Sequence, residues 1–329
     1  MLRIITSHSA EGAKKYFDVS LKTSDYSTKN IGTWGGKGAE MLGFEGAVER
    51  KDFVALINNR WPGANGKRLT ARMNKTRLED VKDKKTGLPV RHPETGDVQK
   101  REVSNRRAGY DFTFSVPKSV SLYLAVNEDK VVEQVIAEAL DETMATVEAR
   151  METKVRKGYQ HDNRLSQNMV YAKFVHGESR PVDGIPDPHY HIHVFAMNAT
   201  FDEVEKEWKA LEVGNTVGDR TFYEAHFHHL LAARLDLSGY GIRRTEQHFE
   251  FASVGRELVE KFSRRTKLIE QRARDKYKVL EAQARALMKS TNMAFDDAFA
   301  HVIAEIGGDW DKWKSNLGAR RSTKSVKSW

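Results

Sequence analysis

Alternating hydrophobic and polar positions mark the clearest strands in this sequence. In YDFTFS (110–115) three aromatic residues alternate with Asp111, Thr113 and Ser115. NMVYAKFVH (168–176) and DPHYHIHVFAMNAT (187–200) have the same extended character. Because successive side chains of an extended chain point to opposite sides, these stretches predict β-strands.

Apolar residues spaced three or four positions apart predict the helices. Such a stripe runs through 129–157 and predicts one long helix that ends at Gly158. Further helices are predicted over 219–238, 256–290 and 294–306. Turn-forming pairs recur through 62–107, so we expect that stretch to be rich in loops.

Histidines gather in two of the predicted strands. His189, His191 and His193 share one face of their strand, where neighbouring imidazoles lie about 7 Å apart. His176 ends the preceding strand, and the Pro- and Gly-containing loop between them is long enough to return the chain antiparallel. His176, His191 and His193 therefore predict a three-nitrogen metal site with open coordination positions.

Two alternatives stay open for these histidines. An isolated histidine is more often a surface or satisfied core residue than a ligand, although three alternating histidines on one strand are rarer. His189 can either replace His176 as a ligand or flank the site. Its place beside Pro188, at the start of the strand, favours the flanking position.

Asp111 stands among aromatic residues on its predicted strand, where a carboxylate needs a cation or a hydrogen-bond donor if it is buried. A metal-ligating imidazole usually donates its second N–H to a carboxylate or a carbonyl. Asp111 is therefore a candidate partner for one of the ligand histidines.

Composition narrows the classes of protein. The 329 residues allow one large domain or two modest ones, and no apolar run is long enough to span a bilayer. The chain has no cysteine, which excludes disulfides, thiolate metal sites and cysteine nucleophiles and fits the reducing cytoplasm, where we expect the protein. Its net charge of +8 favours a polyanionic partner.

Basic residues concentrate in 62–107, which we interpret as a nucleic-acid contact surface rather than as a merely solvated excursion. The tail GARRSTKSVKSW is also basic, and we interpret it either as an arm on nucleic acid or as the beginning of a truncated segment. The glycines of WGGKG (34–38) do not fit G-x-x-x-x-G-K-[ST], so no nucleotide cofactor is expected. The residues predicted to contact DNA are Lys67, Arg68, Arg72, Arg77, Arg180, Arg320, Arg321 and Lys324.

Several of these stretches, in this order, resemble the motifs of one family. HGESR…DPHYHIHVFAMNAT is similar to the histidine motif of the relaxases of bacterial conjugation, in the MobF class of the TrwC/TraI type within the HUH endonuclease superfamily. AGYDFTFSVPKSVS, the opening tyrosines followed by WGGKGAEMLGFEG, SGYGIRR and FSRRTKLIE resemble further stretches of that class. The resemblance covers residues 1 to about 270.

The resemblance implies roles for particular residues. His176, His191 and His193 match the metal ligands, Tyr16 matches the nicking nucleophile, and Asp111 matches the acid beside them. The class often has two adjacent tyrosines at two places, whereas this sequence has Tyr16-Phe17 and an isolated Tyr26. Tyr16 is therefore the expected nucleophile for the first cleavage, and Tyr26, which falls near the second tyrosine pair, is the candidate for a second one.

The fold implied is α+β, with a central, mainly antiparallel sheet, helices on both faces and a helical C-terminal extension. We expect a catalytic core at 1–255 that contains the basic, loop-rich excursion at 62–107. Residues 256–329 are expected to form a basic helical portion that closes over DNA.

The expected activity is site- and strand-specific nicking and joining of DNA at an origin of transfer through a 5′-phosphotyrosyl intermediate. The expected cofactor is a divalent metal, Mg or Mn by cellular abundance, or Zn, Ni, Co or Cu by ligand type. The expected partners are origin DNA, single-stranded around the nick and beside a hairpin, together with accessory relaxosome proteins and a coupling protein. Alternatives are an HUH-type replication initiator, a non-catalytic single-stranded DNA-binding module and a hydrolytic metalloenzyme.

Overall fold

The protein is described from a computed structural model. The part described comprises residues 1–14, 32–64, 66–71, 76–82, 88–92, 95–104, 107–156, 162–246 and 248–305. The chain divides into two compact units, 1–177 with 189–253, and 178–188 with the described residues from 254 onward. Within these described ranges, no helix is long and apolar enough to cross a membrane.

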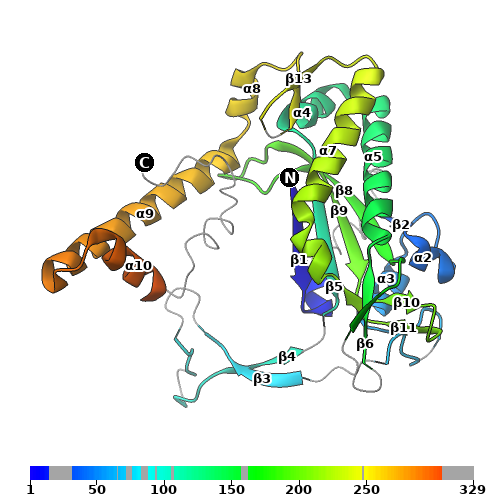
Figure 1. Cartoon of the computed structure of the whole chain (residues 1–329), viewed down its shortest axis with the longest axis horizontal. Helices are drawn as coiled ribbons and strands as arrows, with labels where there is room; N and C mark the ends of the chain where they lie inside the picture. The colour runs from blue at the N-terminus through cyan, green and yellow to red at the C-terminus, as the bar shows by residue number, and fades with distance from the viewer. Residues whose placement is uncertain are drawn as a thin grey trace. The chain divides into compact units, whose positions relative to one another are not determined.

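The first unit is built on a five-stranded antiparallel sheet (Figure 1). Its strands, in spatial order, are β1 (Leu2–Ser7), β5 (Gly109–Ser115), β9 (Pro188–Met197), β8 (Tyr171–Glu178) and β2 (Thr33–Gly35). The three stretches predicted as strands from their alternation are β5, β8 and β9. The histidine-bearing strands β8 and β9 are neighbours, and β5 pairs with β9 on its other side.

One face of the sheet is covered by two long antiparallel-running helices, α5 (Lys130–Glu148) and α7 (Arg220–Leu237) (Figure 1). The aromatic side chains of β5 are buried here, and the rings of Phe114 and Phe227 meet edge to face at 5.3 Å. Ile192 and Val194 of β9 are also buried. The face that carries no histidine is therefore an ordinary apolar core.

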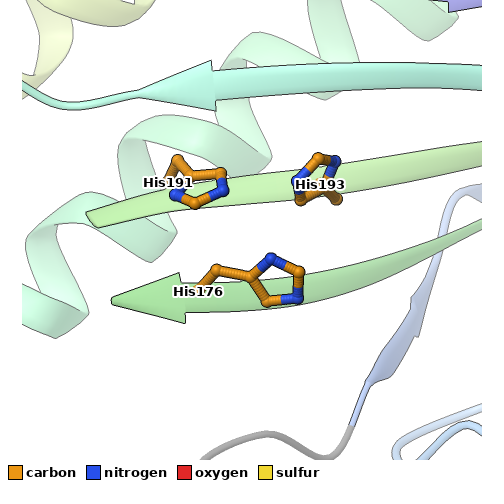
Figure 2. Close-up of side chains that lie close together, drawn as sticks. All are labelled: His176, His191 and His193. Carbon is orange, nitrogen blue, oxygen red and sulfur yellow. The ribbon is translucent and has the colours of Figure 1, made fainter. Parts of the chain in front are cut away.

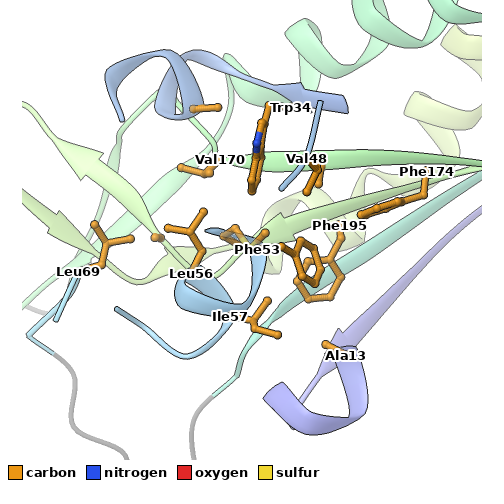
Figure 3. Close-up of a cluster of buried hydrophobic side chains, with 14 of the residues drawn as sticks. Ala13, Trp34, Val48, Phe53, Leu56, Ile57, Leu69, Val170, Phe174 and Phe195 are labelled. Carbon is orange, nitrogen blue, oxygen red and sulfur yellow. The ribbon is translucent and has the colours of Figure 1, made fainter. Parts of the chain in front are cut away.

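The opposite face packs against α2 (Lys37–Met41) and α3 (Arg50–Ile57). Phe53 of α3 is fully buried, and its ring lies 5.7 Å from that of Phe174 on β8 and 5.5 Å from that of Phe195 on β9 (Figure 3). Val170 and Trp34 belong to the same cluster. Helices thus lie on both faces, and this core fixes the two strands on the side from which their histidines project.

The glycines of WGGKG serve close packing. A Cβ on Gly36, which has φ 90°, would lie 2.4 Å from the carbonyl oxygen of Met169, and one on Gly38 would lie 2.7 Å from the same atom. Glu148 is buried at the end of α5, and its carboxylate accepts the backbone N–H groups of Lys37 and Met169 at 2.9 and 2.7 Å. The motif therefore lets the chain pass Met169, just before the start of β8, at backbone contact distance.

The prediction of one helix over 129–157 was wrong at its end. α5 ends at Glu148, and Glu152–Val155 form β6, which pairs with β7 (Asp162–Leu165) and β12 (Leu211–Glu212). Thr153 and Val155 are buried while Lys154 between them is exposed, so the same residues also satisfy the two-residue period of a strand. Gly158 lies outside the described residues.

The excursion at 62–107 is more regular than the turn signals predicted. β3 (Thr76–Asp80) and β4 (Lys100–Ser104) pair as an antiparallel ribbon, and bridges between Lys82 and Pro89 and between Arg91 and Val98 extend it. Charged residues dominate both strands, which is why the hydrophobic pattern did not reveal them.

Short elements complete the first unit. They are α4 (Lys118–Asn127), α6 (Gly214–Gly218), β10 (Thr200–Asp202), β11 (Glu207–Lys209), β13 (Ile242–Arg244) and β14 (Phe249–Phe251). The second unit contains α8 (Arg256–Lys261), α9 (Arg264–Thr291) and α10 (Phe295–Glu305). The helix predicted over 256–290 is therefore interrupted between α8 and α9, whereas the one predicted over 294–306 is α10.

Candidate metal centre

Three histidines from two neighbouring strands meet on one face of the sheet (Figure 2). His176 comes from β8, and His191 and His193 come from β9. One nitrogen of each ring lies within 4.8 Å of the corresponding nitrogen of the other two. That spacing suits three ligands of one ion, and the predicted trio is brought together.

A tight turn joins the two strands. Asp183 and Gly184 have φ of 52° and 79°, and Val182 and Ile185 on either side exchange two backbone hydrogen bonds of 3.1 Å. Two central residues with positive φ are the mark of a type I′ turn, for which Asp-Gly is a preferred pair. The turn fixes the register of the hairpin and hence the positions of its histidines.

Asp111 orients the ring of His193. It lies on β5, and both of its carboxylate oxygens are 2.9 Å from Nδ1 of His193. A carboxylate accepts hydrogen bonds, so Nδ1 carries the proton and Nε2 keeps its lone pair. The hydroxyl of Thr113, the residue directly opposite His193 in the strand pair, is 3.3 Å from the same Nδ1.

His191 is oriented in the same sense by the backbone. Its Nδ1 lies 2.8 Å from the carbonyl oxygen of His189. A carbonyl can only accept, so Nδ1–H of His191 is the donor and Nε2 is left as the metal-facing nitrogen. Two of the three rings thus present the same nitrogen for the same physical reason.

Burial favours the neutral form of two of the rings, those of His176 and His191. Burial, reinforced by the neighbouring His193 and His191, lowers the pKa of His176 to about 4. Burial is also the main cause of the lowered pKa of His191. Neutral imidazoles are the form that binds metals, so the donor set fits a divalent ion, and its nitrogen ligands suit Mn, Co, Ni, Cu or Zn better than Mg.

His189 takes the flanking position. Its ring stacks on that of His191, with centroids 4.8 Å apart and an interplanar angle of 27°, and its Nε2 lies 3.4 Å from the hydroxyl of Ser115. Thr113 and Ser115 were not among the predicted site residues. The alternation of YDFTFS had already placed both on the face of Asp111, and this was the signal that would have identified them.

Tyr16 and Tyr26 lie outside the described residues, as do Arg72, Arg320, Arg321 and Lys324. The other predicted DNA contacts are exposed. Lys67 lies over the ring of Trp61 at 5.0 Å, Arg77 on β3 pairs with Glu79, and Arg180 lies in the turn that joins β8 to β9.

With the site described, the sequence can be compared with known protein families. The family model "TrwC relaxase" matches residues 10–301, and the chain belongs to this family. The expected class, the MobF relaxases of conjugation, is therefore confirmed, together with the α+β fold and its antiparallel sheet.

Particular relatives agree with this assignment. The multifunctional conjugation protein TraI of Escherichia coli is 30% identical over 279 residues, which cover 82% of this chain and 14% of that protein. TraI of Escherichia coli strain K12 is 31% identical over 227 residues, or 68% of this chain and 11% of that protein. The chain thus spans only a small part of the length of these relatives.

Solved structures of the conjugative relaxase TrwC are also similar. A metal-bound complex of TrwC with oriT DNA is 26% identical, with a TM-score of 0.65 over 84% of each chain. A copper-bound complex with oriT DNA is 25% identical, with a TM-score of 0.65 over 94% of this chain and 99% of that one.

Replacing Asp111 by alanine should weaken metal binding. The variant removes the acceptor that fixes the tautomer of His193, and loss of such a partner costs about 10–100-fold in metal affinity. Calorimetric titration of the metal-free protein with Zn²⁺ measures the change. Asp141→Ala, which removes an exposed carboxylate from α5, is the control and should bind as the parent does. Equal affinity in both variants would show that Asp111 has no part in the site.

Proposed function

We propose that this chain nicks and rejoins one strand of DNA at an origin of transfer and so begins conjugative transfer. The observation that carries the proposal is the convergence of three histidine nitrogens beside Asp111 in a member of the TrwC relaxase family. Supporting it, a metal-bound relative was solved with oriT DNA.

The proposed chemistry is transesterification by Tyr16. Its phenolate oxygen attacks the scissile phosphorus, a new phosphorus–oxygen bond forms to tyrosine, and the bond to the 3′ oxygen breaks. The leaving oxygen takes a proton and becomes a free 3′-hydroxyl, while the 5′ phosphate stays linked to the protein. Because one phosphoester replaces another, the reverse step rejoins the strand without ATP. Tyr26 is the proposed second nucleophile.

His176, His191 and His193 would hold the metal ion. When bound, a divalent ion supplies Lewis-acid neutralisation of the phosphoryl oxygens. Neutral imidazole ligands leave the full charge of the ion for that task. The imidazole set favours Mn, Co, Ni, Cu or Zn, whereas cellular abundance favours Mg or Mn.

Asp111 acts in this proposal as an orienting group. Both of its oxygens are within hydrogen-bonding distance of Nδ1 of His193, which favours that role over removal of the phenol proton. A tyrosine with an ordinary pKa near 10 still needs its proton removed. An ion held by His176, His191 and His193 would, through its charge, lower the cost of forming the phenolate.

DNA recognition is proposed to rest on the basic surfaces. A two-stranded ribbon such as β3–β4 fits the major groove of a duplex, so we assign the excursion at 62–107 to a hairpin beside the nick. Residues 1–255 form the catalytic core in this proposal, and 256–329 close over the DNA.

The first half of α9 is strongly basic, with Arg264, Arg265, Lys267, Arg272, Arg274, Lys276 and Lys278 against Glu270 and Asp275. The remaining proposed DNA contacts are Arg180 and the tail residues Arg320, Arg321 and Lys324. We also propose that the protein works with accessory relaxosome proteins and a coupling protein, and that it is located in the cytoplasm.

Tyr16→Phe should abolish covalent attachment to DNA while leaving binding intact. The variant lacks only the attacking oxygen. Labelled single-stranded origin DNA is incubated with protein and Mn²⁺ and run on a denaturing gel, where the parent and the control Tyr26→Phe should give a protein-linked band in the first cleavage.

Other outcomes identify the alternatives. A mobility shift without any cleaved product in the parent indicates a DNA-binding module. Cleavage that releases a free 5′ phosphate indicates a hydrolase. Linkage only to a replication origin indicates an initiator, and an adduct that survives Tyr16→Phe assigns the nucleophile elsewhere.

Neutralising basic residues of the excursion at 62–107 should reduce the salt dependence of DNA binding. The triple variant Lys67→Gln, Arg68→Gln, Arg77→Gln should lower the slope of log K against log salt by up to about one per lost phosphate contact. The control triple Lys51→Gln, Lys130→Gln, Lys206→Gln removes the same charge from exposed ion pairs elsewhere. Binding to a hairpin oligonucleotide is measured by fluorescence anisotropy at several salt concentrations, and identical slopes in the two triples would contradict the assignment.

A further inference from the structure

A buried carboxylate lies in the turn segment between the two histidine-bearing strands. Asp187 is 3% exposed, and its partner is Arg264, the first residue of α9. Nε of Arg264 donates to Oδ1 of Asp187 at 2.7 Å, and the backbone N–H of Arg264 donates to Oδ2 at 2.9 Å. The guanidinium also donates to the carbonyl of Pro186 at 3.2 Å.

The turn segment is itself braced around Asp187. The backbone N–H of Ser179 donates to the carbonyl of Asp187 at 2.9 Å, and the N–H of Asp187 lies 3.2 Å from the hydroxyl of Ser179. Asp187 thus joins both arms of the hairpin to the helix. It lies four residues before the metal-site residue His191 in the chain.

The carboxylate also serves the start of α9. The residue before the helix, Ser263, gives no side-chain cap, and the carboxylate of Asp187 accepts a helix N–H in its place. A negative charge at this end is favoured by the helix dipole as well. The start of α9 is therefore held by the same group that is braced inside the hairpin.

We propose that the bond between Asp187 and Arg264, the Asp187–Arg264 tie, fastens the start of α9 to the turn segment 178–188 and thereby prolongs the hold on the nicked strand. The inference rests on the proposed function, since α9 is there assigned to grip the DNA. With the tie intact, the beginning of this basic helix stays on the turn segment 178–188. With it broken, the helix is joined to that segment only through the rest of the chain, and the strand escapes faster.

The tie is strong because of where it lies. Removing Arg264 leaves a nearly fully buried carboxylate without its cation, which is far more costly than losing an exposed pair. Arg272, also on α9, is exposed and forms no ion pair in the part of the chain that the structure describes. The two positions therefore separate the effect of the tie from the effect of positive charge.

The test compares Arg264→Met with Arg272→Met, which removes the same charge from the same helix. Dissociation of a labelled single-stranded origin oligonucleotide is followed in chelator, so that no cleavage occurs. We expect the dissociation rate of Arg264→Met to exceed that of Arg272→Met by at least about tenfold. Zn²⁺ affinity, measured separately, should equal that of the parent in both variants. Equal dissociation rates would overturn the proposal, because charge alone would then explain the hold.

Amide hydrogen exchange provides a second measurement of the tie, and it needs no DNA. Peptides covering 178–188 and the first turn of α9 should exchange faster in Arg264→Met and in the milder Asp187→Asn, and not in Arg272→Met. Unchanged exchange would show that the tie holds nothing. A parent protein that fails to bind origin DNA would defeat the proposed function, while the exchange measurement still tests the tie.

Discussion

The metal site depends on two hydrogen bonds, each donated by the Nδ1–H group of one histidine to an oxygen acceptor. Nδ1–H of His193 is taken by Asp111, and Nδ1–H of His191 is taken by the backbone carbonyl of His189. Each ring can then turn only its Nε2 toward the third histidine. Without these acceptors the imidazoles could present either nitrogen, and three rings at the same positions would no longer define one binding point.

On the two strands that carry these rings, the histidine face is apolar toward one end and polar toward the end near the turn. Phe174 and Phe195 share the sheet face of the histidines and are buried against Phe53, while His176, His191 and His193 lie further toward the turn. The apolar half of the face anchors the strands in the core. The polar half is thereby held at a fixed register, and burial lowers the pKa of His176 and of His191. One sheet face thus supplies both the support and the chemistry.

Much of this arrangement could be predicted from local patterns. Alternation identified β5, β8 and β9 and placed Asp111 and the histidines on consistent faces, because a strand has a fixed two-residue period. The same logic failed at 149–157, where apolar residues fit both periods and pairing with β7 and β12 decided in favour of β6. The charged ribbon β3–β4 was missed because charged residues dominate both strands and leave no alternation of hydrophobic positions.

Contacts between residues far apart in the sequence could not be predicted from local sequence patterns. Arg264 and Asp187 are 77 positions apart, and nothing in the periodicity of either segment indicates that they meet. The stretches around them, FSRRTKLIE and DPHYHIHVFAMNAT, were notable only through their resemblance to relaxase motifs. Their hydrogen bonds supply a physical reason for both to be present. Tyr16 is known here only from that resemblance, since it lies outside the described residues.

The central claim is that one ion is bound by rings whose tautomers are already set. The most direct measurement is an anomalous difference map, at the zinc edge, from crystals of this protein grown with Zn²⁺. The account predicts one peak about 2.0–2.1 Å from Nε2 of His191, Nε2 of His193 and a ring nitrogen of His176. An ion bonded through Nδ1 of His191 or His193, or bound away from the three rings, would contradict it.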